Sequence, residues 1–97
     1  SPRSDKRPTA WEAVHHLIRS IDKEGEQGAS NVLKQIITGQ GAGFAETVRD
    51  LAYRLYTICE KKGWAQEGFA YNMLVVAWPR LKEMAGRDDK ANQDKLF

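Results

Sequence analysis

The sequence is poor in cysteine, and its single thiol restricts the chemistry that the chain can support. Cys59 is the one cysteine among 97 residues, so neither an internal disulfide nor a zinc site built from several thiolates can form. A chain without disulfides fits a reducing compartment, and we expect a cytoplasmic protein. Cys59 also falls on the apolar stripe of a predicted helix, where a buried thiol is inert, so the position disfavours a catalytic thiol.

Long apolar runs and alternating patterns are also missing. No segment reaches the roughly 18 apolar residues of a membrane span, and residues 1–8 have no apolar centre of the kind that a signal peptide requires. We therefore expect no membrane contact. Residues 1–8 are polar and basic and do not begin with Met, which is typical of a disordered linker cut from a longer protein. Without any period-two alternation, the fold class is predicted to be all-α.

An excess of one charge is missing as well. The chain carries 15 Lys and Arg residues against 13 Asp and Glu residues, a net charge of +2, and the two signs are mixed along it. A dedicated nucleic-acid-binding domain usually shows a basic stripe on one element. The charge pattern therefore favours an ordinary solvated surface.

What the sequence does contain is helical periodicity. Thr9 and Glu12 have the spacing of a capping box at the start of a helix, and Gly25 is a natural stop for it. Lys61, Lys62 and Gly63 are typical of a helix end, and Pro79 predicts a kink or a new short helix. The predicted helices cover about 10–24, 29–38, 44–62, 64–78 and, after the proline, 79–85. We expect a four- to five-helix bundle with a central antiparallel hairpin, forming a helical domain over 9–85 before a disordered tail over 86–97.

Two apolar stripes dominate the predicted hairpin. Its first helix carries a stripe that we expect to be interior, made of Val48, Leu51, Leu55 and Ile58. Its second helix is apolar nearly all round, with one set of side chains opposite another: Phe69, Met73 and Val76 against Tyr71, Leu74, Val75 and Trp78. Such a helix must be covered on more than one side, so the pattern predicts an exposed hydrophobic patch or a dimer seam at Phe69, Met73 and Val76.

Three motifs suggest chemistry but have simpler explanations. His15 and His16 are neighbours that point about 100° apart on a helix, which disfavours joint chelation of a metal. The glycines of 38–43 lack the preceding strand and following lysine of a phosphate loop. The tryptophans Trp11, Trp64 and Trp78 favour packing between helices over base stacking, and the one candidate surface for stacking is that of Tyr53, Arg54, Thr57 and Lys61.

Three segments together carry a resemblance to a known family. They are Trp11-Glu-Ala-Val-His-His-Leu-Ile-Arg19, the stretch from Arg49 to Ala65, and Ala70-Tyr-Asn-Met-Leu-Val-Val-Ala-Trp-Pro79. They resemble the C-terminal end of the large prokaryotic adenine-specific DNA methylases that have an N-terminal domain of unknown function and a zinc-ribbon insertion. The hairpin is also loosely similar to a tetratricopeptide hairpin, although one copy does not make a repeat array.

The resemblance implies a non-catalytic domain of a larger enzyme. The parent would use S-adenosylmethionine, but the chain has no Asp/Asn-Pro-Pro-Tyr motif and no F-x-G-x-G loop, since Gly41-Ala-Gly43 precedes Phe44. We therefore expect no catalytic, cofactor-binding or metal-binding residue here. The expected role is docking onto the methylase core or onto a partner subunit of a DNA modification or defence system. The alternative is an auxiliary DNA-contacting module that uses Arg54, Lys61 and Lys62.

The last five residues add one more candidate. Gln93-Asp-Lys-Leu-Phe97 resembles the Q-x-x-L-F peptide by which bacterial DNA-processing enzymes hold the sliding clamp. Leu96 and Phe97 would enter an apolar pocket while Gln93 forms hydrogen bonds at its rim. A plain disordered end explains the same residues, because so short a motif often arises by chance.

Overall fold

Three helices make up the domain in the computed structural model, which describes residues 9–95, with side chains described over 9–87. They are α1 (Ala10–Gln40), α2 (Ala42–Lys62) and α3 (Ala65–Lys95). The described residues contain no strand, so the prediction of an all-α fold is confirmed. The sequence predicts four or five helices, and the difference in number has its origin at Gly25 and Pro79.

The first helix begins as predicted and then bends. The Glu12 backbone amide donates to Thr9 Oγ1 at 3.2 Å, and the Thr9 amide donates to Glu12 Oε1 at 3.0 Å. This capping box satisfies two amides that the first turn leaves unpaired. At Gly25 the backbone takes φ 73° and ψ −168°, a conformation that essentially only glycine adopts. The predicted stop is therefore correct, but the helix resumes at the next residue, so α1 has two straight arms in place of two separate helices.

The connection between α1 and α2 is also shorter than the sequence predicts. The glycine-rich segment 38–43 is not a loop, because α1 continues to Gln40 and α2 begins at Ala42, with Gly41 alone between them. Gly63 ends α2 in the left-handed conformation (φ 75°, ψ 20°), as its position after Lys61 and Lys62 predicts.

The third helix is longer than predicted at its C-terminal end. It continues through Pro79. The proline removes a single backbone hydrogen bond, and the packed residues on both sides of it hold the helix together. It then extends to Lys95, whereas the sequence predicts a helical domain that ends at 85 and a disordered tail over 86–97. The residues after Gly86 are mostly tolerant of helix and contain no proline. Residues 1–8, the predicted linker, lie outside the described part, as do Leu96 and Phe97.

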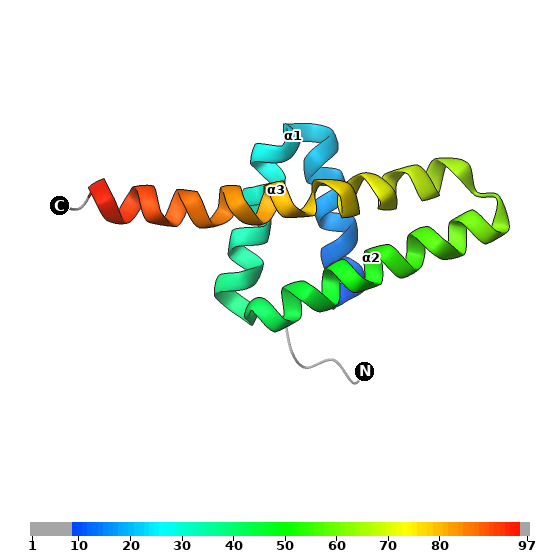
Figure 1. Ribbon diagram of the computed structural model, residues 1–97, viewed down its shortest axis with the longest axis horizontal. Coiled ribbons are helices and arrows are strands. Elements are labelled where there is room, and N and C mark those ends of the chain that lie inside the picture. The colour runs from blue at the N-terminus through cyan, green and yellow to red at the C-terminus, as the bar shows by residue number, and fades with distance from the viewer. Residues whose placement is uncertain (1–8, 96–97) are drawn as a thin grey trace.

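Figure 1 shows the arrangement: α2 and α3 form an antiparallel pair that crosses the two arms of α1. The core lies where the pair meets those arms, and all three helices contribute to it. Its largest fully buried side chains are Leu17, Leu33, Leu74, Leu81, Val14 and Val48. Away from the crossing, the turn end of the α2–α3 pair extends beyond α1.

This offset explains which part of the predicted α2 stripe is interior. Val48 is fully buried, Leu51 and Leu55 are half-buried, and 43% of Ile58 is exposed. Ile58 lies toward the turn end of α2, where α1 no longer covers the helix. The prediction that all four residues are interior is therefore correct for Val48 and wrong for Ile58.

Among residues 9–87, two ion pairs connect α3 to the rest of the domain. Arg80 donates to both carboxylate oxygens of Glu26, at 3.0 Å from Nε and 2.6 Å from Nη2. Lys82 Nζ lies 3.1 Å from Glu46 Oε2 on α2. The Arg80 pair holds α3 against the residue that follows the Gly25 bend, and its two parallel hydrogen bonds fix the geometry of that contact.

The Glu26–Arg80 pair predicts a pH dependence of stability. The hydrogen bonds from Arg80 lower the pKa of Glu26 below its ordinary value of 4.5. Because the folded pKa is the lower one, the stabilisation is present above the unfolded pKa and is lost as the pH falls through the folded pKa. We expect Glu26→Gln to flatten the acid limb of a plot of urea midpoint against pH. Glu83→Gln, which breaks an exposed pair within α3, is the control, and equal acid limbs in the two variants would contradict the prediction.

Candidate functional site

The most exposed apolar side chains of the pair lie on one side of it, away from α1. A helix turns by about 100° per residue, so residues separated by three, four or seven positions share a side. Cys59 and Gly68 mark the line along which α2 and α3 meet, since a Cβ at Gly68 would lie 3.2 Å from that of Cys59. Counted from this line, one side of the pair carries Arg49, Tyr53, Tyr56 and Glu60 of α2 with Phe69 and Val76 of α3. We call these six residues the outer face.

The outer face is apolar and open at its centre. The exposed fraction is 70% for Phe69, 57% for Val76 and 52% for Tyr53. Tyr56 is half-buried, and its ring centroid lies 6.3 Å from that of Tyr53. The buried side chains of α3, including Leu74, Trp78 and Leu81, turn the other way, toward the core. Of the residues predicted to form a patch, Phe69 and Val76 are exposed, whereas Met73 is half-buried at the edge of the face.

The two tyrosines of this face have other neighbours than the sequence predicts. The sequence predicts Tyr53 beside Arg54, Thr57 and Lys61, on the side of α2 away from its stripe. The spacing of four, three and four residues from Arg49 to Glu60 is visible in the sequence. Which side of the α2–α3 pair these residues occupy depends on how α3 lies beside α2, and the spacing alone does not give that.

The predicted DNA-contacting cations lie elsewhere on the hairpin. Arg54, Lys61 and Lys62 are all exposed, and the Lys62 ammonium lies 5.4 Å from the ring centroid of Trp64. Arg54 and Lys61 are seven residues apart and share one side of α2. The prediction that the tryptophans pack between helices is correct for Trp78, which is buried, and wrong for Trp11 and Trp64, which are about half exposed (54% and 51%).

His15 has a structural role rather than a pairing with His16. Its Nδ1 lies 2.9 Å from the Trp11 carbonyl, and its Nε2 lies 2.8 Å from the Tyr71 hydroxyl. A carbonyl can only accept, so Nδ1 carries a proton, and in the neutral imidazole Nε2 then accepts from Tyr71. Burial raises the pKa of Tyr71, which keeps its hydroxyl protonated as the donor. The contact ties α1 to α3, while His16 is exposed.

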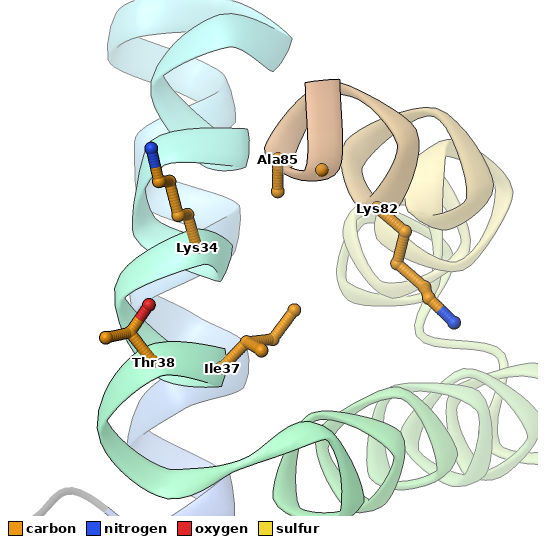
Figure 2. A pocket seen from close by; sticks show the side chains of 6 residues that line it. Lys34, Ile37, Thr38, Lys82 and Ala85 are labelled. Atoms are coloured by element: carbon orange, nitrogen blue, oxygen red, sulfur yellow. The ribbon is translucent and has the colours of Figure 1, made fainter. Parts of the chain in front are cut away.

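A shallow pocket lies between the second arm of α1 and α3. Its volume is about 130 Å³, smaller than the roughly 300–1,000 Å³ of typical ligand pockets. Figure 2 shows Ile37 pointing toward the gap and the amino group of Lys82 pointing away from it, where it pairs with Glu46. The described residues that line an adjoining hollow of about 520 Å³ all belong to α1.

The other predicted site residues are placed as follows. Cys59 is buried, as predicted, against Gly68. Gln93 falls in the last turns of α3, and its proposed companions Leu96 and Phe97 lie outside the described residues. Within residues 9–87 no three His, Cys, Asp or Glu side chains are grouped so that they could hold a metal ion. No helix among the described residues has the length and apolarity needed to cross a bilayer.

Comparison with known proteins identifies a family. A family model described as "Domain of unknown function (DUF8807)" covers residues 1–96. No curated protein and no solved structure matches the chain. Because the model covers nearly every residue, the bent α1 and the α2–α3 pair belong to one family unit. The chain is a member of the DUF8807 family of domains of unknown function.

Proposed function

We propose that this chain is a non-catalytic protein-docking domain whose contact surface is the outer face. The observation that carries the proposal is the exposure of Phe69 and Val76, at 70% and 57%, on a helix whose opposite side already fills the core. Large apolar side chains gathered on an open face mark interaction surfaces. Aromatic residues such as Tyr53 and Tyr56 are enriched in the buried centres of protein interfaces.

The resemblance supplies the setting for this role. The parent protein is an S-adenosylmethionine-dependent DNA adenine methylase of the cytoplasm, and docking joins this domain to the catalytic core or to a partner subunit of a modification or defence system. In this setting the two arms of α1 pack as separate segments. Together with α2 and α3 they form a bundle of four helical segments. The DNA chemistry belongs to the parent and needs no residue of this chain.

A photo-crosslinking residue placed at position 69 tests the docking role directly. In native cells, irradiation is expected to join the domain to its partner through position 69. The same residue placed at exposed Asp22, on α1, is expected to give no adduct. Mass spectrometry identifies the joined protein, and absence of any specific adduct at 69 would overturn the proposal.

The matching variant is Phe69→Asp. Since Phe69 is mostly exposed, the free energy of unfolding is expected to change by less than about 0.5 kcal/mol. Docking is expected to be lost, because a carboxylate would be buried without a partner. Ile58→Asp is the matched control, since Ile58 is also an exposed apolar residue but lies on the other side of α2. Loss of docking in both variants, or in neither, would count against the outer face.

A DNA-contacting role is the second candidate, favoured by the shared exposed side of Arg54 and Lys61. Phosphate contacts release counterions, so binding to duplex DNA would weaken steeply with salt, with a slope that decreases when Arg54, Lys61 and Lys62 are replaced by Gln. The expected result for a docking domain is no saturable binding to duplex DNA at physiological salt.

A further inference from the structure

We infer that the outer face pairs with the outer face of a second copy of this chain, around a two-fold axis that crosses α2 and α3 at right angles. The inference rests on the proposed docking function and names the partner as the same protein. The paired faces would form a bundle of four helices in two layers, with α2 antiparallel to α2 of the other copy and α3 antiparallel to α3.

The first support is a self-complementary pattern on α2. Along the outer face the residues run Arg49, Tyr53, Tyr56 and Glu60. A two-fold axis at the level of residues 54 and 55 brings Arg49 of one copy to Glu60 of the other, and Tyr53 to Tyr56. By symmetry each contact occurs twice, so opposite charges meet at both ends and aromatic rings meet in the middle.

The second support comes from α3, which has a matching pattern at the same height. Phe69 of one copy meets Val76 of the other around an axis at the level of residues 72 and 73. The contact between Cys59 and Gly68 fixes the register of the pair, so one step back along α2 corresponds to one step forward along α3. Residues 54 and 55 are therefore level with 73 and 72. One axis then brings together the complementary residues of α2 and those of α3, although the two patterns lie in separate parts of the sequence.

The size and charge of the face also suit a second copy. With the axis at this level, residues 47–62 of α2 face the same segment of the other copy, so the paired length is about 24 Å, and two helices side by side are about 20 Å wide. Their flat footprint is then about 480 Å², which is smaller than the roughly 800 Å² per partner of a standard interface and fits a weak dimer. A net charge of +2 per copy gives only weak repulsion. Arg49 has just one described ion pair in its own chain, an exposed contact of 3.4 Å with Asp50.

Sedimentation equilibrium with charge variants tests the pairing. The wild-type protein is expected to dimerise within the micromolar to millimolar range. Arg49→Glu and Glu60→Arg each place like charges together twice per dimer, so each variant alone is expected to self-associate at least about tenfold more weakly. Mixing the two variants is expected to restore association, because both contacts between the unlike chains then join opposite charges.

The outcomes separate this inference from the docking role. A wild-type protein that stays monomeric at millimolar concentration overturns the two-fold pairing, as does a variant mixture that associates no better than its components. If position 69 still crosslinks to another protein in that case, docking stands and only the identity of the partner is wrong. A circular dichroism spectrum and melting temperature matching wild type show that each variant is folded.

Discussion

Replacement of Leu81 by alanine is expected to lower the free energy of unfolding by about 2–5 kcal/mol. Leu81 has no exposed surface and belongs to the core formed where α3 meets the other helices. Removing its side chain loses the transfer free energy of the removed carbons and leaves a cavity, since three helices that cross one another relax only partly into the space. The loss is a large share of the stability of a domain this small.

Urea unfolding followed by circular dichroism measures this effect. Val76→Ala is the control, because more than half of that side chain is exposed and its truncation costs little in the isolated domain. The two variants should differ by more than the scatter of replicate curves. A Leu81→Ala midpoint equal to that of Val76→Ala would show that the crossing of α1 and α3 is not the core.

The second large effect is expected at Gly25, where Gly25→Ala should cost about 1–3 kcal/mol. The backbone there has φ 73° and ψ −168°, which an L side chain rarely adopts. A Cβ at this position would meet no atom within 4 Å, so the cost is conformational and not steric crowding by neighbours. The substitution therefore destabilises the bend that brings the two arms of α1 together.

Gly39→Ala is the matched control for this prediction. It lies inside α1, and a Cβ there also meets nothing within 4 Å, but its backbone is ordinary helix. Alanine at such a position restricts the unfolded chain and is expected to stabilise the fold by about 0.4–1 kcal/mol. Opposite signs for two identical substitutions in one helix would identify the bend as the cause. Equal signs would contradict this explanation.

Features that depend on a few neighbouring residues could be predicted from the sequence. The Thr9–Glu12 cap, the stop at Gly25 and the left-handed Gly63 all follow from local hydrogen bonding and backbone freedom. Features that depend on packing could not. Pro79 remains inside α3 because surrounding contacts compensate for one missing hydrogen bond, and the segment around Gly41 is helical almost to the glycine itself.

The outer face shows the same limit. Helical spacing alone identifies Phe69 and Val76 as a pair on one side of α3, but it places Ile58 in the core and leaves Tyr53 with the wrong neighbours. The side of α2 that α1 covers depends on where the arms of α1 cross, and the partners across the hairpin depend on the close approach of Gly68 to Cys59. Both are properties of the assembled domain.

The brevity of the connections has a consequence for proteolysis. Proteases bind their substrates as extended segments, and exposed loops are where most folded domains are cut. Between residues 10 and 95 the helices are interrupted only by the bend at Gly25, by Gly41 and by the pair Gly63 and Trp64. Within this part of the chain a protease has almost no extended substrate, so cleavage requires a helix to open first. The rate of cutting there reports the local unfolding of helices.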